Sequence, residues 1–150
     1  MTPSRWALTA VVAFLLAGCG SDGGEPTRWE GPPRPSATGR VEVSSFNDLV
    51  ARERPASAQS PLLAAAEFLR LDRSDAGTTS LVSQLGGEGN GPAAVVATLD
   101  RLPDDSVRAQ RYVLQLDRQE DGTWRLRSAI WGQRCWPGRG HQGFSAAPCV

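Results

Sequence analysis

The sequence has no lysine, a single histidine and no apolar run long enough to cross a bilayer as a helix. Its sixteen basic residues are all arginine and are matched by sixteen acidic residues, so no net positive field attracts DNA or RNA. The glycine-rich segment 86–92 lacks the Lys-Ser/Thr ending of a phosphate-binding loop, and we predict an ordinary loop there. These absences exclude nucleic-acid and nucleotide binding, and no cofactor motif is present.

Length and composition indicate one globular domain. The chain has 150 residues, of which 40% are hydrophobic and 21% are charged. The segment 20–40, "GSDGGEPTRWEGPPRPSATGR", is rich in glycine, proline and serine and nearly free of aliphatic residues, so we expect residues 19–40 to be a disordered tether. Trp29 is the one exception to this composition, and the sequence leaves two locations open for its side chain, the membrane interface or the surface of the domain. The single domain is predicted over residues 41–150.

The N-terminal segment is typical of an export signal. Arg5 precedes the apolar run 6–18, which is too short to span a hydrocarbon core of ~30 Å. The run ends in "LAGC", Leu16–Cys19, which resembles the lipobox of bacterial prolipoproteins. The resemblance implies that residues 1–18 are removed and that Cys19 carries diacylglycerol. This lipid would anchor the chain to the cell membrane on its extracytoplasmic face. The alternative is a plain secretory signal with an accidental cysteine.

The lipobox resemblance leaves two cysteines to be explained. With Cys19 assigned to lipid, Cys135 and Cys149 form a pair in an oxidising compartment, and we predict a disulfide between them. The chain-entropy estimate for closing such a fifteen-residue ring is ~3 kcal/mol. A metal site is the competing interpretation. Because a structural zinc site needs four donors and only His141 is nearby, we expect no metal.

The first part of the domain carries two helix patterns. Ser45 and Asp48 have the spacing of a capping box, and Pro55 ends the segment. Three apolar residues share one face of this first helix, namely Phe46, Leu49 and Val50. In the second helix, over residues 61–76, Ser60 is the expected N-cap and Pro61 takes the first helical position. Its apolar composition predicts packing against a sheet.

The second half of the domain predicts β-structure. Three segments alternate or are rich in β-branched residues, over 93–100, 107–117 and 123–135, with turn residues between them. We expect a three-stranded antiparallel meander, whereas 78–85 fits either a short strand or a turn of helix. Two helices packed on a curved antiparallel sheet, with a C-terminal disulfide loop, give an α+β fold. In element order this resembles the cystatin-like and NTF2-like cone folds.

Alternation within the meander assigns its two faces. The predicted core residues are Tyr112, Leu114, Leu116, Trp124, Leu126 and Ile130. The opposite face would carry a cationic stripe with an aromatic residue at its end, namely Arg111, Arg125, Arg127 and Trp131.

The C-terminal segment 124–150, with "RGHQ" between two cysteines, resembles the tails of small uncharacterised lipoproteins from high-GC Gram-positive bacteria. The resemblance implies an envelope location and a disulfide, but no activity.

A binding module is the function that the sequence favours. Arginine and aromatic residues are enriched at interfaces, and two surfaces carry them. One is the predicted arginine face, and the other is the ring, with Trp136, Arg139, His141 and Phe144. Either would contact an envelope protein or an anionic ligand. A merely solvated sheet face is the alternative for the arginines.

A small hydrolase with His141 as general base is the alternative function. Ser145 and either Asp104 or Asp105 are the available partners, but no G-x-S-x-G context surrounds the serine. Asp104 and Asp105 also follow a proline, as turn residues do. The plainer interpretation is that His141 and Gln142 bond carbonyl groups of their own loop and that a carboxylate pairs with Arg139.

Overall fold

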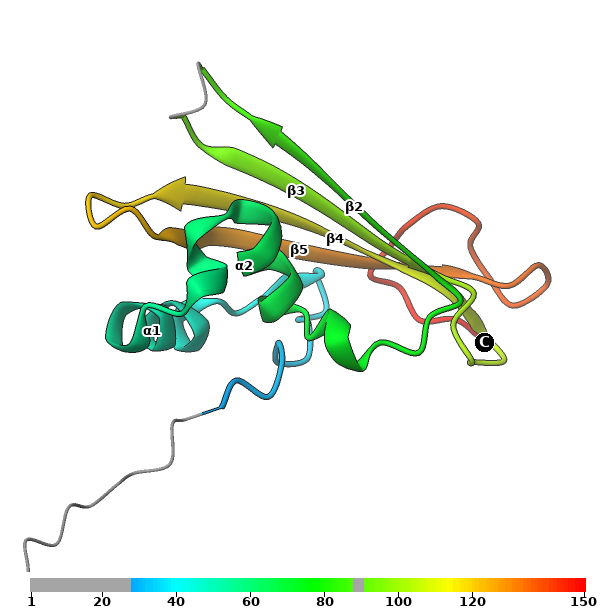
Figure 1. Cartoon of the computed structure of the whole chain (residues 1–150). Helices are drawn as coiled ribbons and strands as arrows, with labels where there is room; N and C mark the ends of the chain where they lie inside the picture. The colour runs from blue at the N-terminus through cyan, green and yellow to red at the C-terminus, as the bar shows by residue number, and fades with distance from the viewer. Residues whose placement is uncertain (1–27, 88–90) are drawn as a thin grey trace, which may run out of the picture.

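The computed structural model describes residues 28–87 and 91–150 of an α+β domain. The predicted signal peptide, Cys19 and the first part of the tether lie outside these residues. Two helices cover one face of an open five-stranded antiparallel sheet, and no helix of these residues lies on the opposite face (Figure 1). Among the described residues, no helix has the length and apolar character needed to cross a bilayer.

The sheet has the order β1-β5-β4-β3-β2. Its strands are β1 Arg40–Val41, β2 Thr78–Leu85, β3 Ala93–Asp100, β4 Val107–Arg118 and β5 Trp124–Cys135. The predicted meander of β3, β4 and β5 is confirmed. The ambiguous segment 78–85 is a strand, while the short β1 was not predicted. Every strand pair is antiparallel.

Helix α1, Ser44–Glu53, buries the predicted apolar face of Phe46, Leu49 and Val50. The helix ends at Arg54, whose φ of 45° is left-handed, just before Pro55. The capping-box prediction is wrong, because Val43 takes the N-cap position and Ser45 already lies inside the helix. Instead the carboxylate of Glu42 accepts the backbone N–H of Ser44 and, at 3.5 Å, the hydroxyl of Ser45. These bonds, chiefly from Ser44, lower the pKa of Glu42.

Helix α2, Pro61–Phe68, is shorter than predicted. Ser60 is its N-cap residue and Pro61 its first residue, as the sequence predicts. The helix stops because Arg70 adopts a left-handed conformation, with φ of 51°, and turns the chain into the short 3-10 helix η2, Leu71–Arg73. Another 3-10 helix, η1 Ala56–Gln59, joins α1 to α2. The side of α2 that is buried carries alanine and phenylalanine.

A β-bulge in β5 overturns part of the predicted face assignment. Gln115 pairs with Ser128, but the next residue, Leu116, pairs with Leu126, so Arg127 is an extra residue in β5. Beyond an extra residue the alternation of faces is inverted. Ile130 is therefore 44% exposed on the uncovered face, and the prediction that it belongs to the core is wrong.

Trp131 moves to the helix side for the same reason and packs against the core, so its place in the cationic stripe is also wrong. The neighbouring residue Ala129 fills the core in place of Ile130 and is 2% exposed. The remaining core predictions are confirmed, with Leu114, Leu116, Trp124 and Leu126 buried and Tyr112 packed against them.

Trp29 docks on the domain. Its ring lies edge-on to Phe46, with centroids 5.1 Å apart, and stacks on Phe68 at 5.8 Å. Its Nε1–H donates to the carbonyl oxygen of Phe68 at 2.8 Å. This settles the question that the sequence left open. The packed part of the chain extends N-terminal of residue 41, into the segment predicted as tether.

Candidate functional site

The C-terminal ring is closed by the predicted disulfide. Cys135 and Cys149 are bonded, with their Cα atoms 5.6 Å apart. Inside the ring, Nδ1 of His141 lies 2.8 Å from the carbonyl oxygen of Gly143, and Nε2 lies 2.9 Å from that of Ala147. The two sulfurs and an imidazole nitrogen lie within 4.8 Å of one another. A disulfide is not the thiolate pair that zinc binds, so this cluster is a covalent clasp.

His141 holds the loop together. Its pKa is raised, first by the bond to the Ala147 carbonyl and then by the bond to Gly143, because both acceptors favour the protonated ring. A general base needs a free nitrogen lone pair, and here both nitrogens face carbonyl oxygens. The hydroxyl of Ser145 accepts the N–H of Ala147 at 3.1 Å, and the imidazole nitrogens of His141 are bonded to carbonyl groups and not to this hydroxyl. This geometry argues against the hydrolase alternative.

The other polar residues near the ring are also structural. Gln142 donates to the carbonyl of Gly140 at 3.1 Å, as the plainer interpretation predicted. Asp104 is the turn residue that the sequence suggested, since its carboxylate accepts the N–H groups of Ser106 and Val107 at 2.8 and 2.6 Å. These bonds lower its pKa. In the described part of the chain, no carboxylate forms an ion pair with Arg139, so the predicted pair is not found there.

Two aromatic side chains of the ring pack beside arginines. The guanidinium of Arg111 lies 4.0 Å from the ring centroid of Phe144, on the uncovered face of the sheet, and that of Arg134 lies 5.3 Å from it. The guanidinium of Arg108 lies 5.4 Å from the ring centroid of Trp136, whose Nε1–H also donates to the carbonyl of Asp104 at 2.8 Å. The Phe144 side chain borders a hollow of about 250 Å³, which is smaller than a typical ligand site.

The predicted arginine stripe is largely neutralised by aspartates. Arg125 pairs with Asp121 at 3.1 Å, and Arg127 pairs with Asp117 at 3.5 Å. Arg111 donates to a threonine hydroxyl and stacks on the aromatic ring described above. The eight predicted binding residues are therefore not brought into one site. The alternative of a solvated sheet face fits Arg125 and Arg127.

A larger cleft lies on the helix side, and sequence reasoning missed it. Its volume is about 530 Å³. Three loops wall it, over residues 30–32, 73–75 and 102–104, and its floor includes Leu99 of β3 with Gln110 and Tyr112 of β4. The sequence did contain one indication of this cleft. Gln110 points to the same side of β4 as Tyr112, and it is a polar residue in a row that is otherwise apolar in this strand.

The lining of the cleft is mixed. Leucine, proline and tyrosine side chains share it about equally with charged and polar side chains. Burial raises the pKa of Tyr112, so its hydroxyl stays a hydrogen-bond donor at neutral pH. At the mouth, Arg73 pairs with Glu30 at 3.0 Å, and both side chains are largely exposed. The hydroxyl of Ser74 accepts the N–H of Ala76 at 3.3 Å.

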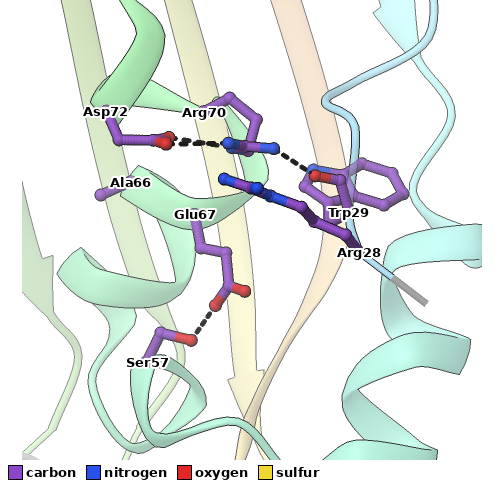
Figure 2. A pocket seen from close by; sticks show the side chains of 7 residues that line it. All are labelled: Arg28, Trp29, Ser57, Ala66, Glu67, Arg70 and Asp72. Carbon is purple, nitrogen blue, oxygen red and sulfur yellow. Dashed lines mark hydrogen bonds and ion pairs between the residues drawn. The ribbon is translucent and has the colours of Figure 1, made fainter. Parts of the chain in front are cut away.

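A second hollow of about 400 Å³ lies beside the cleft, with Arg70 lining both (Figure 2). Arg70 donates two bonds of 2.8 Å to Asp72 and a third to the carbonyl of Trp29. Hydrogen bonds from Arg70 lower the pKa of Asp72 to about 2. Ser57 donates to Glu67 on the opposite wall. These polar groups are therefore hydrogen-bonded to one another, and the residues around this hollow attach the N-terminal segment to α2.

Comparison with known proteins finds no matching family model, no similar curated protein and no similar solved structure. The function must therefore be argued from the geometry of this chain. That geometry offers a ligand-sized cleft on the helix side, a neutralised arginine face and a ring whose histidine is engaged by its own loop.

Proposed function

We propose that this protein is an exported, lipid-anchored binding module of the cell envelope, and that it binds an amphipathic ligand in the helix-side cleft without catalysis. The observation that carries the proposal is the cleft itself. Its volume of about 530 Å³ lies within the ~300–1,000 Å³ of small-molecule sites, and its lining combines an apolar floor with charged and polar groups. Two helices preceding an antiparallel sheet also support a cystatin-like or NTF2-like cone fold.

The lining suggests the chemical class of the ligand. The floor, with Leu99 and Tyr112, suits an apolar body, and the Gln110 amide and the Tyr112 hydroxyl suit a hydrogen-bonding group. Among the described residues, Arg73 at the mouth forms one ion pair, the exposed one with Glu30, and such pairs contribute ~0–1 kcal/mol. An anionic head group can therefore replace Glu30 at little cost. A fatty acid or another anionic amphiphile fits this arrangement.

The proposed anchor would hold the cleft near such ligands. Only residues 20–27 separate the predicted lipidated Cys19 from Arg28, the first described residue. At ~3.6 Å per residue, this segment spans at most about 30 Å. The wall over residues 30–32 follows directly, so a lipidated chain keeps the cleft close to the head groups. The catalytic alternative loses support because the His141 nitrogens are engaged by loop carbonyls.

Two experiments test the proposal. Mass spectrometry of the protein purified from membranes should show a chain starting at Cys19 with diacylglycerol attached, and Cys19→Ala should abolish the attachment. For the cleft, the probe is cis-parinaric acid, an anionic fatty acid whose fluorescence rises in apolar surroundings. Ser74→Trp, which fills the cleft, should remove the signal, while Ser80→Trp on the uncovered face should retain it. Equal binding by both variants would contradict the cleft assignment.

A further inference from the structure

The two edges of the sheet differ in whether other parts of the chain bond to their backbone groups. Along β5, the chain itself closes the outer edge. Asn47 of α1 acts as a strand mimic, since its amide donates to the carbonyl of Leu126 at 2.8 Å and accepts the N–H of Leu126 at 3.0 Å. Further along, Trp131 donates to the carbonyl of Gly39 at 2.7 Å.

The ring closes the last part of the same edge. Gln133 and Ser145 exchange backbone bonds of 2.8 and 2.9 Å, and Cys135 donates to the carbonyl of His141 at 3.1 Å. The β5 edge is thus occupied at its start by a helix side chain, in its middle by β1 and the residue before it, and at its end by the ring. No further strand can add there without displacing these groups.

Strand β2 forms the opposite edge, and no other element of the described residues covers it (Figure 1). In the described ranges 28–87 and 91–150, β3 is the only element that pairs with it. Natural edge strands are commonly protected by charges, prolines, bulges or short length. The sequence of β2, "TTSLVSQL", has eight residues with no charge and no proline, and its pairing with β3 has no bulge. Val82 and Leu85 are 54% and 53% exposed.

We propose that this edge binds β2 of a second copy of the chain, so that two sheets join into one antiparallel ten-stranded sheet. The partner is argued from charge and symmetry. Without Arg5 of the predicted signal peptide, residues 19–150 carry fifteen basic and sixteen acidic residues, a net charge of −1, so two copies repel each other little, and β2 brings no like charges together. An antiparallel pair of identical strands forms a two-fold interface, the commonest kind in homodimers.

The uncovered face selects the register. A row of apolar side chains crosses this face at paired positions, namely Val82, Val96, Val113 and Ile130. When Val82 lies opposite its counterpart, this row continues through the second sheet without a break. On the helix side the same register sets Leu85 opposite Thr79 of the second copy. A cross-strand pair of two β-branched residues, such as Val82 and its counterpart, stabilises a sheet.

The test uses residues 19–150 with Cys19→Ser, which contain every described residue and leave only the ring cysteines. Sedimentation equilibrium over a wide concentration range should show a monomer–dimer equilibrium. Val82→Lys sets two like charges directly opposite each other and should raise the dimer dissociation constant about tenfold or more. Ile130→Lys is the matched control, with the same charge on the same face but away from the edge, and should leave that constant unchanged. Circular dichroism checks that both variants fold.

Cross-linking tests the register. Val82→Cys should form an intermolecular disulfide under mild oxidation. Ser80→Cys should not, because the offset of four residues separates the two thiols by about 13 Å along the strands. A monomer at every concentration overturns the proposal. So does equal weakening by Val82→Lys and Ile130→Lys, which would indicate stacking of the uncovered faces, and so does cross-linking of Ser80→Cys in place of Val82→Cys.

Discussion

Replacing Trp29 with alanine tests whether the N-terminal segment belongs to the folded domain. The ring contacts Phe46 and Phe68 at centroid distances of 5.1 and 5.8 Å, and its Nε1–H donates a 2.8 Å bond. Truncating a buried tryptophan to alanine costs about 3–5 kcal/mol. Because Trp29 is only partly buried, the lower end applies, and we expect a loss of about 3 kcal/mol in the free energy of unfolding. A tether residue would contribute almost nothing.

Urea unfolding followed by circular dichroism measures this loss, in parallel with two controls. Trp29→Phe keeps an aromatic ring but loses the bond to the Phe68 carbonyl, so it should cost about 1 kcal/mol. Pro33→Ala changes an exposed position of the same segment and should stay within about 0.5 kcal/mol of the native protein. If Trp29→Ala also stays within that margin, the docking of this segment is refuted.

Three further predictions follow from the ring and the cleft. Replacing Cys135 and Cys149 with serine should lower the free energy of unfolding by about 3 kcal/mol, as measured in urea, and an unchanged value would contradict a stabilising clasp. The raised pKa of His141 means that the folded ring binds its proton more tightly than the unfolded chain, so the stability it adds is full below the unfolded value of 6.5 and is lost as pH rises through the folded value. The stability difference between native protein and His141→Gln, measured from about pH 5 to about pH 9, should therefore shrink with rising pH, whereas a constant or growing difference would have the wrong sign. Tyr112 is the single tyrosine, so tyrosinate absorbance reports on it alone, and its titration midpoint should lie above 10 unless the cleft floor is solvated.

The sequence predicted most of the meander because alternation is a local signal. It failed at Ile130 and Trp131, where one extra residue in β5 inverts the two faces. The bulge is defined by the pairing of Leu116 with Leu126, which is a long-range relation that alternation within one strand does not contain. The short β1 was missed for the same reason, since two residues form a strand only where a neighbouring strand is already in place.

The sequence predicts which residue types are suited to binding, but it does not predict which groups these side chains contact in the fold. Arginines on alternate positions of a strand do point to one face, yet their charges are cancelled by Asp117 and Asp121, which lie in and after β4. The plainer interpretation of the single histidine, that it bonds carbonyl groups of its own loop, is confirmed. It could be made from the sequence because a constrained loop offers many acceptors nearby. Ion pairs across strands depend on register, so the sequence could not separate a charged site from a neutral surface.

The cleft could not be predicted from the sequence, because its walls come from three loops that are far apart along the chain. Two residues that depart from their local pattern nevertheless mark it. Trp29 is a large apolar residue in a segment of glycine and proline, and its docking brings residues 30–32 onto the domain as one wall. Gln110 is a polar residue at an inward position of β4, and it lies in the floor. Because burying an unpaired polar group costs free energy, a polar residue at a core position indicates an opening to solvent or ligand there.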